Sequence, residues 1–139
     1  MEHFFDTFRD KLNIGELDVR TYSPLSLAYI GDSIYDVLVK LYLVGQGNRS
    51  VNQFHKLSKN YIKASEQARI LKAIEHMLTE EELKIVKRGR NAKSRSVPKN
   101  ANLNDYQLAT GFECLLGYHM INRDYDRIIE CVVEGINHD

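Results

Sequence analysis

The sequence feature that most constrains the fold is one long apolar segment, Leu25–Val44. Ser23 and Pro24 precede it, and Ser is a favoured N-cap while Pro suits the first helical position. Gly45 and Gly47 follow it, as is common after the C-terminus of a helix. The segment therefore predicts a helix of about five turns. Because apolar residues occur nearly all round this helix, we expect protein to cover both of its sides.

Helical spacing of apolar residues continues through the rest of the chain, and no stretch alternates with the period of two that is typical of strands. Ser50 with Gln53 and Thr79 with Glu82 form predicted capping boxes, and Asn104 is the predicted N-cap of a later helix. The expected helices cover residues 3–12, 25–44, 51–60, 63–78, 80–92, 105–121 and 124–136. The inward side of the first helix should carry Phe4, Phe5, Phe8 and Leu12.

Length and composition indicate one globular domain. The chain has 139 residues, of which 43% are hydrophobic and 27% are charged, so it can bury a core. We expect an all-α, single-domain helical bundle over residues 1–139. No apolar run of about 18 residues is free of charge, and the N-terminus lacks a signal-peptide core, so we expect no membrane span and a cytoplasmic location. Cys114 and Cys131 should be reduced, buried thiols.

Two acidic residues interrupt apolar helices. Asp32 follows Gly31 in the long helix, and Glu113 lies in the segment ATGFECLLGY, one turn from Ala109 and from Gly117. A carboxylate in apolar surroundings is costly unless a cation meets it. The small neighbours allow another helix to approach closely. If the two helices pack together, the carboxylates face each other, and Mg²⁺, or Mn²⁺ in its place, removes their repulsion.

The alternative interpretation is that both acids form ion pairs inside the protein. Glu113 could pair with Arg88 or Lys93, which precede its helix. Asp36, one turn after Asp32, either tunes the site from nearby or lies on a solvated helix face.

The net charge of the chain is zero, but its charges are distributed unevenly. Residues 84–99 contain seven Lys and Arg residues and no acid, and such a segment attracts polyanions. Asn side chains within and beside it can hydrogen-bond to sugar hydroxyls, although turn or cap roles are equally open. For each cation, a solvated surface charge is the alternative. The residues that could contact a polyanion are Arg88, Arg90, Asn91, Lys93, Lys99 and Asn100.

A pair of carboxylates suited to Mg²⁺, a basic segment and no nucleophilic side chain together indicate hydrolysis of a phosphodiester. His55, beside Lys56 and Lys59, is interpreted as a packed histidine, with contact to an RNA backbone as the alternative.

Three motifs resemble one enzyme family. The segment YIGDSIYDVLV resembles the signature helix of the ribonuclease III family, and ATGFECLLGY resembles its second conserved helix. KRGRNAKS followed by PKNA is similar to a subgroup called Mini-ribonuclease III. The resemblance spans roughly residues 23–136, with the motifs in the order of the family.

This resemblance implies an all-α endonuclease domain that works as a homodimer and cuts double-stranded RNA with Mg²⁺. It implies no separate double-stranded-RNA-binding domain, and maturation of the large-subunit (23S) ribosomal RNA precursor as the task. Asp32 matches the signature aspartate, and Glu113 matches the metal-binding catalytic glutamate. Leu25, Ala28 and Thr110 replace acids of the full-length enzymes, which implies more water around the metal and is interpreted as a mark of the subgroup.

Two other functions fit the same residues. One is a non-catalytic helical module that binds RNA or ribosomal particles through the basic segment and needs no metal. The other is a helical scaffold in which the buried acids are ion-paired.

Overall fold

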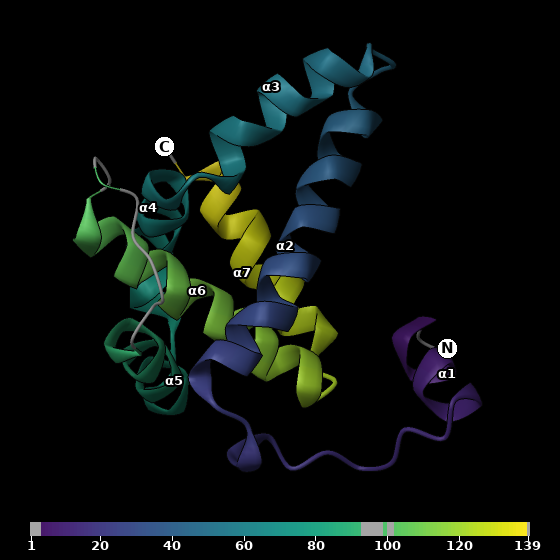
Figure 1. The fold of residues 1–139 in the computed structure, drawn as a ribbon, viewed down its shortest axis with the longest axis vertical. Helices are drawn as coiled ribbons and strands as arrows, with labels where there is room; N and C mark the ends of the chain where they lie inside the picture. The colour runs from purple at the N-terminus through teal and green to yellow at the C-terminus, as the bar shows by residue number, and fades with distance from the viewer. Residues whose placement is uncertain (1–3, 93–98, 100–101, 139) are drawn as a thin grey trace.

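The structure, a computed structural model, describes residues 4–92, 99 and 102–138 (Figure 1). Over these residues it contains α-helices and short 3₁₀ helices and no strand, so the predicted all-α fold is confirmed. The elements are α1 (Phe4–Lys11), η1 (Val19–Thr21), α2 (Pro24–Gly45), α3 (Val51–Ile62), α4 (Ala64–Ile74), η2 (Glu75–Met77), α5 (Glu80–Asn91), α6 (Leu103–Ile121) and α7 (Tyr125–Asn137).

Local capping explains where most of these helices begin. The Ser23 hydroxyl accepts a hydrogen bond from the backbone N–H of Ser26, and both predicted capping boxes are present. The predicted cap at Asn104 is wrong, because Asn102 caps α6 by accepting from the backbone N–H of Asp105 at 3.2 Å. Lys63 has extended backbone angles (φ −59°, ψ 149°), which separate α3 from α4.

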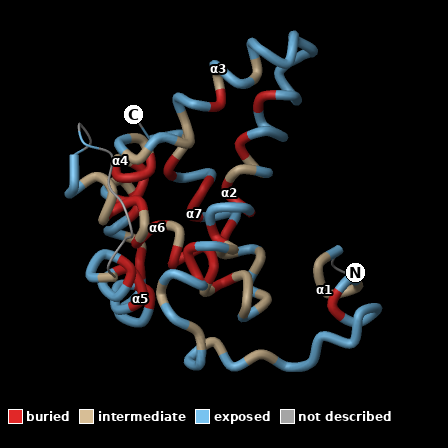
Figure 2. Tube along the Cα trace, viewed as in Figure 1, coloured by how far each residue is buried: buried red, intermediate tan, exposed pale blue. Residues whose placement is uncertain are grey.

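Helix α6 lies at the centre of the molecule, with α2, α4, α5 and α7 packed around it (Figure 1). The buried stretches of the chain gather where these helices meet α6 (Figure 2). Phe112 of α6 and Tyr35 of α2 are fully buried and pack edge to face, and the Tyr35 hydroxyl donates to the carbonyl of Tyr61 at 2.8 Å. Cys114 and Cys131 are free and buried, as expected.

Helices α2 and α6 touch through their backbones at two glycines. A Cβ atom placed on Gly31 would lie 1.8 Å from the carbonyl oxygen of Glu113. A Cβ atom placed on Gly117 would lie 1.8 Å from the carbonyl oxygen of Leu27. No side chain fits between the helices at these points, so the two glycines fix how α2 crosses α6.

The predicted inward face of α1 is correct for Phe5 and wrong for the other three residues. Phe5 is half-buried and packs against the core, with its ring centroid 5.6 Å from that of Tyr125. Phe4, Phe8 and Leu12 are 81%, 56% and 59% exposed. Polar contacts also hold the helix: Arg9 donates to the carbonyl of Ile121 at 3.1 Å, and Asp6 accepts from the Tyr125 hydroxyl at 2.7 Å.

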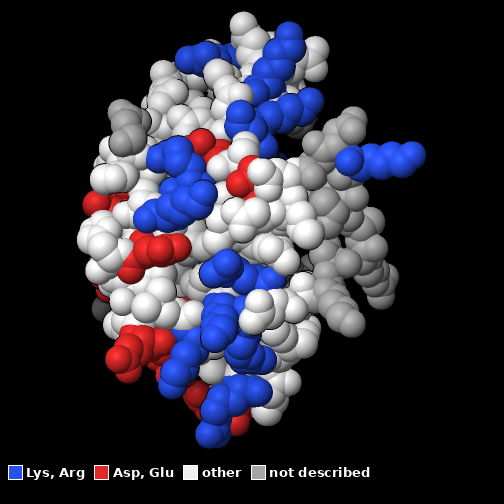
Figure 3. Space-filling model, turned by 90° about the vertical axis from the view of Figure 1, so that its left-hand side faces the viewer, with Lys and Arg blue, Asp and Glu red and all other residues white. Residues whose placement is uncertain are grey.

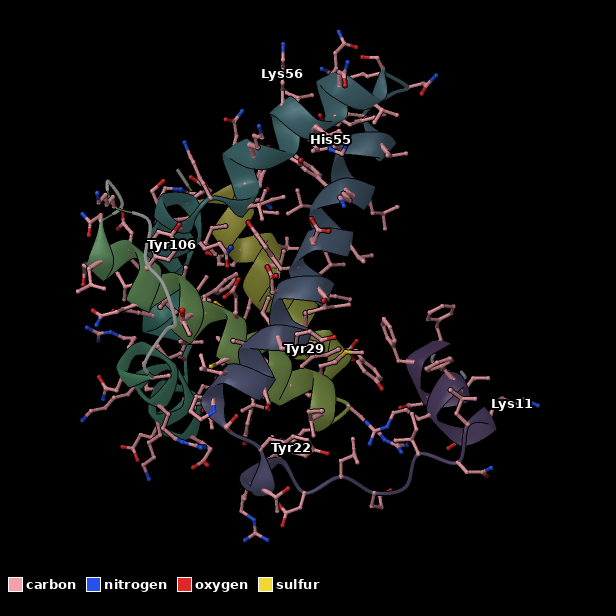
Figure 4. The ribbon with its side chains drawn as sticks, in the orientation of Figure 1. Lys11, Tyr22, Tyr29, His55, Lys56 and Tyr106 are labelled. Atoms are coloured by element: carbon pink, nitrogen blue, oxygen red, sulfur yellow. The ribbon has the colours of Figure 1, made fainter. Side chains whose placement is uncertain are left out.

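The expectation that protein covers both sides of α2 is also wrong for the single chain. Helices α3, α5 and α6 pack against this helix, yet Tyr29 is 79% exposed, and Val37 and Leu41 are 56% and 66% exposed. Figure 4 shows Tyr29 at the surface of α2. Within the described residues no helix has both the length and the apolar character needed to cross a membrane.

A buried ion-pair network joins α5, α6 and α7. The Glu82 carboxylate accepts two hydrogen bonds from Arg127, at 2.8 and 2.9 Å, and lies 2.7 Å from the Nε2 atom of His119. Arg127 also donates to the carbonyl of Met77 at 2.7 Å. Burial alone raises the pKa of Glu82, but the hydrogen bonds from Arg127, the Thr79 backbone and His119 lower it to about 2.

We predict that Glu82→Gln lowers the free energy of unfolding by about 3 kcal/mol near neutral pH, because it leaves the Arg127 charge without its buried partner. The lowered pKa of Glu82 means that the unfolded chain takes up a proton first as the pH falls. The stabilisation is therefore present above the ordinary pKa of 4.5 and is lost as the pH falls toward about 2. Urea unfolding of both proteins at about pH 7 and about pH 3 measures this change.

Glu81→Gln is the matched control, because Glu81 is an exposed acid in the same helical turn. This change should alter the free energy of unfolding by less than about 0.5 kcal/mol. A Glu82→Gln effect of equal size at both pH values contradicts the prediction.

Candidate active site

The helix crossing brings Asp32 and Glu113 together. Asp32 follows Gly31, whose backbone lies against the Glu113 carbonyl, so the two acids stand beside the closest contact of α2 and α6. Asp32 is exposed and Glu113 is partly buried. The two carboxyl groups therefore lie close together, at a position half open to solvent.

The electrostatics of the pair are unfavourable for two negative charges. Burial, the Asp32 charge and the hydrogen-bonding contact between the two carboxyls together raise the pKa of Glu113 to about 8, burial having the largest effect. Within the described residues, neither Asp32 nor Glu113 forms an ion pair with a basic side chain. The suggested partner Arg88 instead points to the carbonyl of Tyr22, with its Nη2 atom 3.5 Å from that oxygen.

The donor set of this site fits a hard divalent cation. Two carboxylates from different helices supply oxygen ligands, and the exposure of Asp32 leaves room for water at the other positions. The amide oxygen of buried Gln67, which adjoins Glu113, has no hydrogen-bond partner in the described structure. Within the same residues no group of three His, Cys, Asp or Glu side chains could hold a metal ion, so a site here depends on these two acids and water.

The C-terminal end of α5 places cations near this pair. Gly89 packs on α6, where a Cβ atom would lie 2.7 Å from the sulfur of Cys114, and Arg88 and Arg90 on either side of it are exposed. The Cγ atom of Arg90 would meet a Cβ placed on Gly111, two residues before Glu113, at 3.1 Å. Lys and Arg side chains gather over α5 in the lower part of the face in Figure 3, and a second group lies over α3.

Only two of the other four candidate RNA contacts lie within the described residues. Asn91 and Lys99 are exposed, and Lys93 and Asn100 lie outside the described residues. His55 is exposed on α3, so its interpretation as a packed histidine is wrong (Figure 4). The neighbouring Lys56 projects outward from the same helix.

Two residues near the acid pair are engaged elsewhere. Asp36 forms an ion pair with Lys40, one turn later in α2, at 2.9 Å. The Thr110 hydroxyl donates to the carbonyl of Tyr106 at 2.9 Å within its own helix.

Sequence reasoning missed Gln67, which reaches the site from α4. Its side chain is 3% exposed, and its contact with Glu113 lowers the pKa of that acid. A signal was available, since Gln67 falls in the same helical register as the buried residues Leu71 and Ile74. A polar residue at a core-facing position is informative, because burying an amide is costly unless it is hydrogen-bonded.

Comparisons with known proteins agree with this geometry. A sequence profile of the Ribonuclease III domain matches residues 25–124. The Mini-ribonuclease 3 of Brevibacillus brevis is 44% identical over 118 residues, which cover 85% of this chain and 88% of that protein. The Mini-ribonuclease 3 of Clostridium tetani is 40% identical over 122 residues, covering 86% of this chain and 80% of that protein.

The fold is also similar to a solved structure. A crystal structure of a protein from Fusobacterium nucleatum superposes with a TM-score of 0.75 at 29% sequence identity, covering 84% of this chain and 93% of that one. The profile match and the identity with the curated relatives extend over most of the chain. The chain therefore belongs to the ribonuclease III family, in its Mini-ribonuclease III group, and is an endoribonuclease.

Proposed function

We propose that this protein cleaves double-stranded RNA with a divalent cation, Mg²⁺ or Mn²⁺, held by Asp32 and Glu113. The observation that carries the proposal is the juxtaposition of these two carboxyl groups without an ion-pairing cation in the described structure. A buried acid with a strongly raised pKa, in contact with a second acid, is typical of a functional site. Nearby basic residues on α5 supply a contact surface for phosphates.

The chain's own residues have separate roles in this proposal. Asp32 and Glu113 hold the cation through their carboxylate oxygens, and Glu113 gives up its proton to do so, because its pKa is about 8 without the ion. The bound ion supplies a water molecule of lowered pKa and stabilises the charge on the leaving oxygen. Arg88 and Arg90 bind phosphates beside the scissile bond and orient the strand.

RNA recognition then depends mainly on shape. The deep, narrow major groove of an A-form duplex is poorly accessible to side chains, so contacts fall on phosphates and 2′-hydroxyl groups. Arg88, Arg90, Lys93 and Lys99 are the proposed phosphate contacts. Asn91 and Asn100 are the proposed partners of the sugar hydroxyls, which distinguish RNA from DNA.

The proposed physiological substrate is the precursor of the large-subunit ribosomal RNA, cleaved in the cytoplasm. The support for this substrate is the resemblance to the Mini-ribonuclease III group, to which the relatives' similarity over most of the chain assigns this protein. The free, buried Cys114 and Cys131 are compatible with a reducing compartment.

The proposed assembly is a homodimer built on the open side of α2. Leu25, Tyr29, Val37 and Leu41 are large apolar residues of α2, and all four are exposed. Several large apolar side chains of one helix in water favour an interaction partner. A two-fold dimer pairs this surface with itself and provides two equivalent centres, one for each RNA strand.

We predict that Asp32→Asn and Glu113→Gln each reduce duplex cleavage by about 100-fold or more, because the ion contributes several kcal/mol to the transition state. RNA binding in EDTA should remain close to that of the unchanged protein. Asp36→Asn, which removes the same chemical group one turn along α2, is the control and should cleave normally. Normal cleavage by either site variant, or by the unchanged protein in EDTA, contradicts the proposal.

The double substitution of Arg88 and Arg90 by Ala should weaken duplex binding. It should also reduce the slope of log Kd against log salt concentration by about 1 to 2, because up to two phosphate contacts are lost. Binding is measured in EDTA by fluorescence anisotropy across a salt series. The double substitution of Lys11 and Lys72 by Ala removes two exposed cations, on α1 and α4, and should leave the slope unchanged. Equal slopes for the two double variants would exclude the α5 surface.

For the homodimer, Val37→Arg should shift the protein from dimer to monomer in sedimentation equilibrium, because it places a charge in the apolar face of α2. Leu83→Arg, a change at an exposed apolar residue of α5, should leave the dimer intact. A dimer that survives Val37→Arg shows that α2 is not the interface.

A further inference from the structure

One buried polar side chain beside the active site has no explanation in the packing of the fold. Gln67 lies in α4 between buried apolar neighbours, and its side chain is 3% exposed. Buried amides in native proteins have hydrogen-bond partners for nearly all of their polar atoms. The partners of Gln67 therefore indicate what the residue does.

The amide nitrogen of Gln67 has two N–H donors, and one of them has a clear partner in a neighbouring helix. It donates to the carbonyl of Ile62 at 2.7 Å. Ile62 is the last residue of α3, and Lys63 breaks the helix immediately afterwards, so this carbonyl needs a donor from outside its own helix. The bond fixes which end of the Gln67 amide is nitrogen and which is oxygen.

The amide oxygen of Gln67 is buried and has no hydrogen-bond partner anywhere in the described part of the chain. The same amide is close enough to Glu113 to lower the pKa of that carboxyl. The oxygen is bonded to the same carbon atom as that nitrogen and is left without a donor. Once Glu113 has given up its proton to a cation, both acids are acceptors as well, so this group of side chains then has more acceptors than donors.

We propose that Gln67 is a positioning residue of the metal site: its amide nitrogen holds the Glu113 carboxylate in place, and its free oxygen accepts a hydrogen bond from the hydration water of the divalent ion. This inference rests on the proposed function, since it requires an ion at Asp32 and Glu113. Mg²⁺ keeps several of its waters in protein sites, and these waters are donors. Partners outside the ligands orient both ligands and water, and their loss costs about 10- to 100-fold in metal affinity.

The test measures Mn²⁺ binding without RNA, from the electron paramagnetic resonance signal of free Mn²⁺. Gln67→Met keeps the length of the side chain and removes both hydrogen-bonding atoms, so it should weaken Mn²⁺ binding about 10- to 100-fold. Gln67→Glu keeps an acceptor oxygen and adds charge, so it should restore the affinity at least to that of the unchanged protein. Ile70→Val alters the same helix at a buried position beside Gly135 and should leave the affinity unchanged.

The outcomes separate the two proposals. If the unchanged protein binds Mn²⁺ no better than the Asp32→Asn, Glu113→Gln double variant, the metal site itself is refuted, and the role of Gln67 with it. If the unchanged protein binds Mn²⁺ and Gln67→Met binds it equally well, only the role of Gln67 is refuted. A purely structural role predicts that Gln67→Glu binds as weakly as Gln67→Met, which also overturns the inference.

A second measurement needs no variant and stays decisive if Gln67→Met fails to fold. The side-chain amide signals of Gln67 in a ¹H–¹⁵N NMR spectrum should shift when Mg²⁺ is added and broaden with a small fraction of Mn²⁺. Signals that stay unchanged while those of the Glu113 backbone respond to the ion overturn the inference.

Discussion

The contact of the α2 backbone with the α6 backbone at Gly31 and Gly117 is the constraint on which the site depends. With no side chain between the helices, the residues next to each glycine are brought within reach of the opposite helix. Asp32 follows Gly31 directly, and Glu113 is the residue of α6 whose carbonyl Gly31 contacts. The apolar packing of α6 against α2, α4, α5 and α7 supplies the favourable free energy that offsets the repulsion of two acids at one point. The fold therefore maintains a local arrangement that is unfavourable by itself.

The buried acid Glu82 and the partly buried acid Glu113 have opposite electrostatic surroundings. Glu82 is surrounded by donors from Arg127, His119 and the backbone of Thr79, and its pKa falls to about 2. Burial and a neighbouring carboxyl instead raise the pKa of Glu113 to about 8. Both residues belong to the same small helical core, so the difference lies in their partners. One acid joins three helices, and the other has a second acid as its neighbour.

The sequence predicted the features that local rules control. Capping boxes and apolar spacing located the helices, and Gly and Ala one turn from each acid indicated that Asp32 and Glu113 could meet. The errors arose where tertiary contacts decide. The Phe-rich side of α1 has the periodicity of a buried face, but only Phe5 packs against the core, and the polar residues Asp6 and Arg9 also hold the helix. Gln67 was missed because its importance depends on the end of a different helix, at Ile62, and on a carboxyl of α6.

The packing of Gly89 against α6 fixes the distance between the arginines of α5 and the acid pair. This glycine holds the arginine-bearing end of α5 directly against the helix that carries Glu113, with the sulfur of Cys114 filling the contact. Neither element can slide without opening the core between them. Under the proposed function, the grip on the duplex and the point of scission are thus parts of one stiff body. In such a body the distance between the arginines of α5 and the acid pair is fixed. That distance, together with the helical repeat of the RNA, would then determine which phosphodiester bond is cut.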